Sequence, residues 1–376
     1  MAAIMAAIME ITENIMRRMR EPSTKLHNAL YFMSGMMVVI LALVIVAGVK
    51  TKAENAGFHI ADDTENSYEQ QVAGQTDTTQ DSGQEKWQEG VVAYQGKEYL
   101  YNTDIKTYLM MGVDINGPVQ QSSDYTQGGQ SDALFLLVVN NKTEQLQVIS
   151  INRNTMADIE LCDEEGIDMG PLKTQICLQH AFGDGKRLSC SKTVDAVSGL
   201  FQNIPISGYL AMNMGGIPQM NDAVGGVEVT VLQDISFPKA GVNLKKGQKV
   251  TLNGTQAYYY LHGRDTEEYD SATKRLQREE QYIVAYMDKL KKVSTENPDQ
   301  VTEIYNSVSD YLVTSVDFTS MIEQLMNYGF SEDQMYTVPG KTVEGKPIDG
   351  KRYEEYHVDE DAMEELIMKV FYTHVQ

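Results

Sequence analysis

The sequence predicts an α/β fold, with a central mixed β-sheet flanked by helices, behind one N-terminal transmembrane helix. Two observations support this prediction. Short apolar segments bounded by polar turns, typical of buried strands, are interleaved with longer segments of helical periodicity. One uncharged segment near the N-terminus is also long enough to cross a bilayer.

The transmembrane segment is Ala29–Val49, 21 residues without a charge. A helix of this length spans a hydrocarbon core of about 30 Å. It exceeds the apolar core of a cleaved signal peptide, about 7–15 residues, so we expect a retained signal-anchor helix. Four basic residues precede it and two follow closely, which favours a cytoplasmic segment at 1–28 and an exterior C-terminal part. The chain is therefore expected to be a single-pass protein of the cell membrane.

The charge of the chain is divided unequally by this segment. Residues 1–52 carry six Lys/Arg and three Asp/Glu, which leaves 25 basic and 50 acidic residues outside. So acidic a surface repels nucleic acid, and we expect no nucleic-acid partner.

Cysteines are few in the exterior part. Cys162, Cys177 and Cys190 are too few for a disulfide scaffold, and none has the C-x-x-C spacing of a zinc or redox site. One bridge with one free thiol and three reduced thiols are both compatible with the sequence.

Composition divides the exterior chain into three parts. Residues 50–90 are polar and low in complexity, so they cannot bury enough apolar surface to offset the entropy of ordering, and we expect a flexible stalk. Residues 91–295 are expected to form the main extracellular domain. Residues 296–376 are expected to form a C-terminal helical extension packed on that domain.

The elements of the domain follow from apolar spacing. A hairpin is expected to turn at Gln95–Gly96. The sequence then predicts strands at Ile105–Val113, Ala133–Val139, Leu146–Ile151 and Val227–Leu232, the last after a turn at Gly225–Gly226. Helices are predicted at Ser191–Gln202, Ile217–Ala223, Thr255–Leu261 and Ala272–Lys292, with tail helices at Val301–Tyr311, Phe318–Tyr328 and Asp359–Tyr372.

Arginines mark a candidate anion site. Only six lie outside the membrane, and four of them fall in two short segments, as Arg153, Arg264, Arg275 and Arg278. The guanidinium group is a planar, permanently charged fork that matches phosphate oxygens. Arg275 and Arg278 are three residues apart on a predicted helix and so share a face. Pairing of these arginines with the plentiful surface acids is the alternative.

Two aspartates stand at predicted strand ends. Asp114 follows one strand and Asp132 opens the next, so the two carboxylates can meet at one edge of the sheet. Such hard oxygen ligands hold Mg²⁺, with waters and phosphate completing the shell. Capping or turn formation is the alternative for each. His180 is expected to be packed or hydrogen-bonded, whereas His262, two residues before Arg264, is a candidate site residue.

In this order behind one membrane helix, the stretches LMMGVD, GGQSDALFLLVVN, VISINRNTM, NDAVGGVEVTV, LNGTQAYYYLHGRD and KRLQREEQYI resemble the LytR–CpsA–Psr (LCP) family of Gram-positive-type cell envelopes. The resemblance covers about residues 106–290. It implies a domain whose sheet and helices enclose an apolar lipid pocket. It also implies a phosphotransferase that moves a glycopolymer (teichoic acid, capsule or other wall polysaccharide) from an undecaprenyl-diphosphate carrier to peptidoglycan, with Mg²⁺ as cofactor.

The resemblance assigns roles to individual residues. Asp114 and Asp132 match the metal-associated aspartates. Asp114, Asp132, Arg153, Arg264 and Arg275 are the expected catalytic set. The expected diphosphate-binding set is Arg153, Arg264, Arg275, Arg278, His262 and Gln130.

Several of these positions depart from the family pattern. Gln130 and His262 stand where arginine is usual, Glu279 replaces a glutamine, Asn152 and Asn154 flank Arg153, and Cys177 lies near a usual lysine. Each lost phosphate contact is worth roughly 1.5–3 kcal/mol, although His262 is expected to donate a hydrogen bond and carry charge at lower pH. The alternative function is therefore a non-catalytic protein that binds the polyprenyl-diphosphate glycan or a wall polymer.

Overall fold

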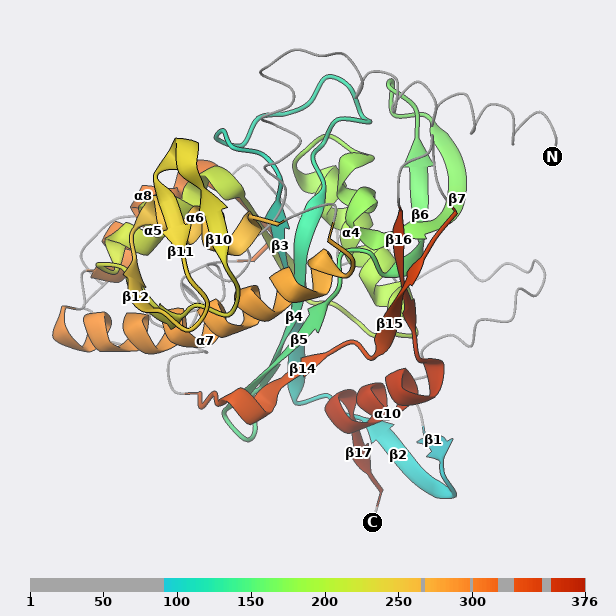
Figure 1. The fold of residues 1–376 in the computed structure, drawn as a ribbon. Helices are drawn as coiled ribbons and strands as arrows, with labels where there is room; N and C mark the ends of the chain where they lie inside the picture. The colour runs from blue at the N-terminus through green and yellow to red at the C-terminus, as the bar shows by residue number, and fades with distance from the viewer. Residues whose placement is uncertain (1–90, 265–267, 298–299, 317–327, 347–352, 376) are drawn as a thin grey trace, which may run out of the picture.

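A computed structural model of the protein describes residues 91–264, 268–297, 300–316, 328–346 and 353–375 (Figure 1). The predicted transmembrane helix, the stalk and nearly all of the predicted helix at residues 318–328 lie outside these ranges. Within these ranges, no helix is both long and apolar enough to span a bilayer.

A six-stranded sheet of mixed direction forms the centre, in the order β13-β8-β3-β4-β5-β14. Its strands are β3 (Ile105–Val113), β4 (Ser131–Asn140), β5 (Gln145–Ile151), β8 (Gly208–Asn213), β13 (Leu312–Thr314) and β14 (Met335–Thr337). β4 is antiparallel to β3 and β5, whereas β8 runs parallel to β3 and β14 parallel to β5. The predicted mixed sheet is therefore confirmed.

Helices and a hairpin cover both faces of this sheet. One face packs against α5 (Ile217–Ala223), α6 (Gly254–His262), α7 (Ser271–Glu296) and α8 (Gln300–Val308). The other packs against α4 (Arg187–Leu200), the hairpin β6–β7 (Met156–Cys162, Asp168–Gln175), the turn η2 (Ile176–Ala181) and α10 (Glu360–Phe371). Because both faces are buried, the central strands are apolar throughout rather than alternating.

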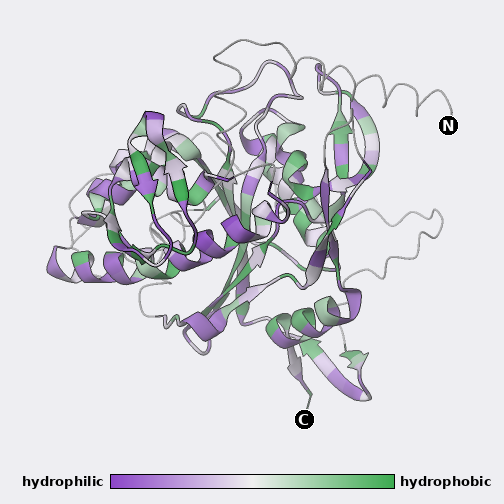
Figure 2. Ribbon diagram, viewed as in Figure 1, coloured by the Kyte–Doolittle hydropathy of each residue, from purple (hydrophilic) through white to green (hydrophobic). Residues whose placement is uncertain are grey.

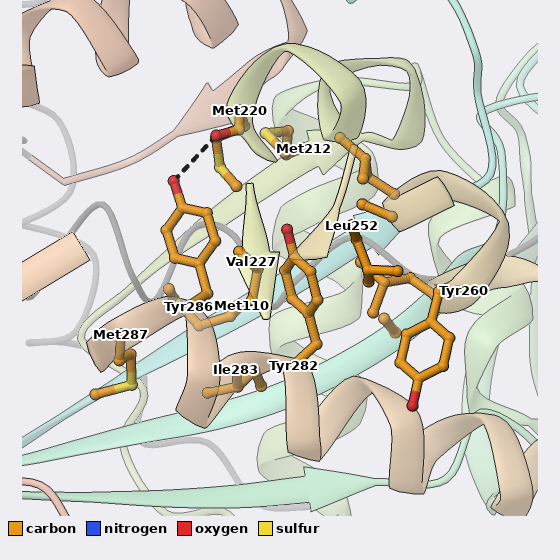
Figure 3. Close-up of a cluster of buried hydrophobic side chains, with 14 of the residues drawn as sticks. Met110, Met212, Met220, Val227, Leu252, Tyr260, Tyr282, Ile283, Tyr286 and Met287 are labelled. Carbon is orange, nitrogen blue, oxygen red and sulfur yellow. Dashed lines mark hydrogen bonds between the residues drawn. The ribbon is translucent and has the colours of Figure 1, made fainter. Parts of the chain in front are cut away.

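The core under α7 is rich in methionine and tyrosine (Figure 3). α7 is amphipathic, and its apolar residues recur every three or four positions on the sheet side (Figure 2). The buried Tyr282 hydroxyl donates to Asn221 Oδ1 at 2.9 Å, and the Tyr286 hydroxyl to the Met220 carbonyl at 3.4 Å. In the structure these side chains pack between the sheet and α7. The lipid pocket enclosed by sheet and helices stays a prediction.

Turn chemistry fixes the predicted hairpin and one helix end. Gln95 and Gly96 both have positive φ, 49° and 74°, between β1 (Val91–Tyr94) and β2 (Lys97–Tyr101), as a tight hairpin requires. Gly225 and Gly226, at φ 75° and 86°, end α5 and lead into β9 (Val227–Thr230). β9 pairs with β12 (Lys249–Leu252), and β10 (Ile235–Phe237) pairs with β11 (Val242–Leu244).

Helix ends differ slightly from their predicted positions. α4 begins four residues early, because Asp184 Oδ1 accepts hydrogen bonds from the backbone N–H groups of Lys186, Leu188 and Ser189. α6 begins after Asn253, which forms a capping box with Gln256.

The tail from residue 296, expected as a helical extension, contributes strands as well as helices. β13 and β14 form the two edges of the central sheet, and β15 (Gly340–Glu344) pairs with β16 (Glu354–Val358). The terminal β17 (Tyr372–His374) joins β2. Short strands of three to five residues lack the helical periodicity that the prediction used, which is why they were missed.

Candidate functional site

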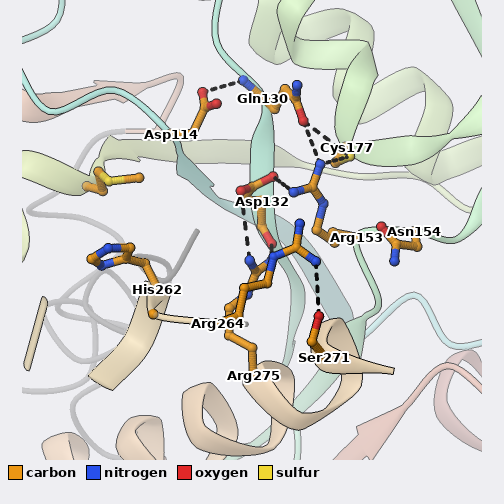
Figure 4. Close-up of polar contacts among 12 residues, drawn as sticks. Asp114, Gln130, Asp132, Arg153, Asn154, Cys177, His262, Arg264, Ser271 and Arg275 are labelled. Atoms are coloured by element: carbon orange, nitrogen blue, oxygen red, sulfur yellow. Dashed lines mark hydrogen bonds and ion pairs between the residues drawn. The ribbon is translucent and has the colours of Figure 1, made fainter. Parts of the chain in front are cut away.

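Three neighbouring strands bring Asp114, Asp132 and Arg153 together at one end of the sheet (Figure 4). Asp114 follows β3, Asp132 is the second residue of β4, and Arg153 follows β5. Because β4 is antiparallel to both neighbours, its beginning lies beside their ends. Arg264 and Arg275 reach the same place from the end of α6 and the first turns of α7.

A buried ion pair lies at the centre. Arg153 Nη1 is 2.8 Å from Asp132 Oδ1, and both side chains are almost fully buried. Arg275 Nη2 donates to the Asp132 carbonyl at 2.9 Å, while its Nη1 lies 3.9 Å from Asp132 Oδ2. Arg275 Nε also pairs with Glu279, one turn along α7, at 3.2 Å. Asp132 thus lies between two guanidinium groups.

Two neutral side chains complete the surroundings of Arg153. Its Nη2 donates to Gln130 Oε1 at 2.5 Å and to Cys177 Sγ at 2.9 Å. Burial opposes the charge of Arg153, but Asp132 beside it raises its pKa above the ordinary value. Arg153 therefore stays charged although it is buried.

Arg264 is the least compensated member of the cluster. It is half-buried, and its contact with Ser271 Oγ from Nη1 is long, 3.5 Å. Burial, followed by the charges of the neighbouring Arg153 and Arg275, lowers the pKa of Arg264 to about 9. Burial also raises the pKa of Glu279 to about 8. Near neutral pH, positive charge exceeds negative charge here, which suits a phosphate-type anion.

Arg278 lies in the same region but is engaged elsewhere. Its Nε donates to the Tyr260 carbonyl at 2.7 Å, its Nη2 to the Gly263 carbonyl and its Nη1 to Gln233 Oε1. The guanidinium group therefore holds the C-terminal end of α6 against α7. The structure does not bring Arg278 to Asp132 with the other three arginines.

His262 is packed in an aromatic cluster. Its Nδ1 contacts the Tyr258 carbonyl, its ring lies 3.9 Å from the Tyr258 ring between centroids, and the residue is fully buried. Burial lowers the pKa of His262 to about 3. Protonation of His262 therefore needs a lower pH than that of an ordinary histidine, because the charged ring cannot be hydrated in its buried position.

Asp114 and Asp132 are the two carboxylates that the sequence predicts to hold magnesium. The Gln130 carbonyl accepts from the N–H groups of both aspartates, at 3.0 and 3.1 Å, and the Gln130 N–H donates to Asp114 Oδ1 at 2.6 Å. Burial, followed by the Asp132 charge, raises the pKa of Asp114 to about 7. No third His, Cys, Asp or Glu completes a metal-binding group in the described ranges. Carboxylates are the hard oxygen ligands that Mg²⁺ takes while it keeps several waters, although Asp132 is also paired with Arg153.

Some contacts could not be predicted from the sequence. Ser271, which approaches Arg264, precedes Arg275 by four residues on one helix face, and this spacing could have indicated it. Cys177 was noted only as a departure from the family pattern, and its contact with Arg153 is made by the position of η2 in the fold. His180 is hydrogen-bonded as predicted: its Nδ1 lies 3.1 and 3.0 Å from the carbonyls of Gly128 and Gly129. All three cysteines are buried free thiols.

The fold is an α/β domain with an arginine–aspartate cluster at the ends of its central strands, and comparisons place the chain in a family. The LytR_cpsA_psr family model matches residues 61–370, and the protein belongs to this family. The crystal structure of TagV from B. subtilis has a TM-score of 0.54 at 22% identity, covering 72% of this chain and 96% of that one, which supports the fold.

Curated relatives share part of the chain. The polyisoprenyl-teichoic acid–peptidoglycan teichoic acid transferase TagU of Enterococcus faecalis is 29% identical over 231 residues, 61% of this chain and 67% of that protein. TagU of Halalkalibacterium halodurans is 28% identical over 220 residues, 58% of this chain and 64% of that protein. The matches span about two thirds of these relatives.

Proposed function

We propose that the protein is a phosphotransferase that moves a glycopolymer from a polyprenyl-diphosphate carrier to peptidoglycan. The observation that carries the proposal is the surplus of positive charge where Arg153, Arg264 and Arg275 surround Asp132. Family membership and the names of the relatives, which transfer teichoic acid, support the substrate class.

The reaction needs charge stabilisation more than covalent chemistry. A peptidoglycan hydroxyl oxygen attacks the phosphorus on the glycan side and loses its proton. The bond from this phosphorus to the bridging oxygen breaks, and polyprenyl phosphate leaves with the electron pair. Arg264, the half-buried member of the cluster, would contact the phosphate oxygens first. The more deeply buried Arg153 and Arg275 would stabilise the negative charge that develops on them.

Mg²⁺ belongs to the same proposal. Asp114 and Asp132 would hold it, and the ion would neutralise phosphate oxygens when bound. The protein's own residues hold the two aspartates in place. The Gln130 backbone is hydrogen-bonded to both, and Arg153 forms an ion pair with Asp132.

A carrier lipid held between the sheet and its helices would have to displace buried side chains. Met110, Met212 and Met220 fill that space, and methionine repacks more readily than branched side chains. The predicted anchor at 29–49 would place the domain outside the cell membrane, next to a carrier in the same bilayer.

The proposal is tested by transfer with the full chain in detergent. A labelled polyprenyl-diphosphate glycan and peptidoglycan oligomers are incubated with Mg²⁺ or with EDTA. We expect polyprenyl phosphate and covalently linked glycan in equal amounts, with Mg²⁺ only. Asp114→Asn should remove the dependence on Mg²⁺ together with most of the activity, and Arg187→Ala, an exposed arginine on α4, is the matched control.

Two results would contradict the proposal. Release of polyprenyl phosphate without linked glycan would indicate hydrolysis. Tight Mg²⁺-dependent binding without turnover would instead establish the alternative, a binding protein for the lipid-linked glycan.

A further inference from the structure

The β15–β16 hairpin of the tail contacts the N-terminal end of α7, which carries Arg275. Asp270, immediately before α7, has a left-handed backbone at φ 59°. Its N–H donates to Glu354 Oε1 of β16 at 2.7 Å, and its Oδ1 accepts from the Thr342 hydroxyl of β15. An aspartate in this strained conformation is held in place by its surroundings, and here two of the holding groups come from the tail.

The same hairpin contacts the segment that carries Arg153. The Glu354 carbonyl accepts from Gln175 Nε2 at 2.7 Å, and Gln175 Nε2 also donates to Asn154 Oδ1 at 3.0 Å. The Tyr356 N–H donates to the Asn154 carbonyl at 2.9 Å, next to an isolated parallel bridge between Thr155 and Tyr356. Asn154 is almost fully buried. This residue directly follows Arg153, so the hairpin reaches the other half of the cluster.

One further contact closes the frame between the two segments. Asn152 Nδ2 donates to Thr273 Oγ1 at 3.0 Å, and the Thr273 hydroxyl donates to Asp270 Oδ1 at 2.6 Å. Asp270 therefore receives hydrogen bonds from α7 and from the tail, and the chain of contacts extends to the residue before Arg153. The two asparagines that flank Arg153 thus have a structural reason: both join this frame.

We propose that the β15–β16 hairpin positions the arginine cluster, with Glu354 as the residue that bridges its two halves. The Glu354 side chain reaches Asp270, and its carbonyl reaches Gln175. It is a positioning residue, because its contacts join the segments that carry Arg153 and Arg275, which lie more than a hundred residues apart in the sequence. Its effect on turnover rests on the proposed function, whereas its effect on the geometry does not.

The test compares Glu354→Ala, Glu354→Gln and Thr342→Val with the control Glu355→Gln in the full chain. Glutamine keeps an oxygen acceptor for the Asp270 N–H, and valine removes only the Thr342 hydroxyl. Glu355 is the next residue of β16 and pairs with His357 instead. Amide hydrogen exchange at residues 152–155 and 270–275 is measured without substrate, and kcat and KM are measured in the transfer assay.

We expect Glu354→Ala to speed exchange at residues 270–275 by about tenfold, the effect of one lost hydrogen bond. Exchange at residues 152–155 should rise by a smaller factor, because the Glu354 carbonyl that accepts from Gln175 is kept in the variant. Its kcat should fall about 10- to 100-fold, as for a displacement of roughly 1 Å, with a smaller change in KM because the lipid supplies much of the binding. Thr342→Val should change both readouts in the same direction but less. Glu354→Gln should recover most of kcat, and Glu355→Gln should match the wild type.

The outcomes separate the two proposals. Faster exchange at 270–275 alone, or equal kcat in Glu354→Ala and the wild type, overturns the positioning role. If the wild type itself shows no transfer, the proposed function fails, while exchange in the two segments still decides whether the hairpin couples them. Should Glu354→Ala fail to fold, Thr342→Val gives the same decision.

Discussion

Arg264 and Arg275 differ in how their charges are compensated. Arg275 is buried between Asp132 and Glu279, whereas Arg264 is half-buried and close to two other guanidinium groups. Removing Arg275 leaves the buried carboxylate and carbonyl of Asp132 without one of their partners, but removing Arg264 relieves repulsion. Substitution by alanine should therefore affect the free energy of unfolding differently at Arg264 and at Arg275.

We predict that Arg264→Ala abolishes transfer with a change below about 1 kcal/mol in the free energy of unfolding. Arg275→Ala should abolish transfer and cost about 3 kcal/mol or more. Urea unfolding beside the transfer assay measures both, with Arg187→Ala as control. Equal destabilisation by the two substitutions would show that the burial of Arg275 does not set its role.

The buried His262 makes stability depend on pH. Its folded pKa of about 3 lies below the ordinary 6.5, so between these values the unfolded chain binds the proton and the folded one does not. The contribution of neutral His262 is therefore present above pH 6.5 and is lost as the pH falls toward 3.

We predict that the stability advantage of the wild type over His262→Gln shrinks between pH 7 and pH 4. Urea unfolding of both proteins at the two pH values gives this difference, in which other titrating groups cancel. His357→Gln, at an exposed histidine of β16, is the control. An advantage that stays constant with pH would mean that His262 titrates normally.

The sequence predicted the members of the cluster better than their surroundings. Asp114, Asp132 and Arg153 were found because strand ends can be recognised by apolar spacing. The structural roles of Arg278 and His262 could not be predicted in this way. Arg278 donates to the Tyr260 and Gly263 carbonyls, and these contacts depend on how α6 packs against α7.

At the scale of elements, the tail is part of the sheet. β13 and β14 close its two edges, although the predicted boundary at residues 295/296 separates them from the domain. β3, β4, β5 and α7 were predicted within a few residues because each is long or continuously apolar. Three-residue edge strands were not, since they are formed by pairing with distant partners.

We predict that a chain ending at residue 295 loses its cooperative unfolding transition. It would lack both edge strands and the buried side chains of Ile304, Val308, Val338, Ile367 and Phe371. At about 1.5–3 kcal/mol each, these rival the whole stability of a domain, about 5–15 kcal/mol. Thermal unfolding followed by circular dichroism measures the loss. A chain ending at Phe371, which lacks only β17 and the last two residues, is the control and should unfold cooperatively; a cooperative transition in the shorter chain would contradict the prediction.

At the scale of the whole molecule, an acidic protein has to bind an acidic substrate. Outside the predicted anchor the chain carries 25 basic and 50 acidic residues, whereas the arginine cluster of the site is largely buried. Long-range forces on an approaching diphosphate are therefore repulsive, and attraction begins only at the site. A membrane anchor would help such a protein to meet its substrate. Enzyme and lipid-linked substrate would then meet by diffusion in one bilayer, without electrostatic attraction from solution.

We therefore predict that kcat/KM for a water-soluble, short-chain lipid-diphosphate glycan rises as NaCl increases from about 0.01 M to about 0.1 M. Over this range the screening length falls from about 30 Å to about 10 Å, which removes the surface repulsion but leaves the buried ion pairs nearly unscreened. Initial rates at subsaturating substrate and fixed Mg²⁺ measure the effect, with sucrose at equal osmolality as control. A fall in kcat/KM with salt would mean that the arginine cluster, rather than the acidic surface, governs the approach of the substrate.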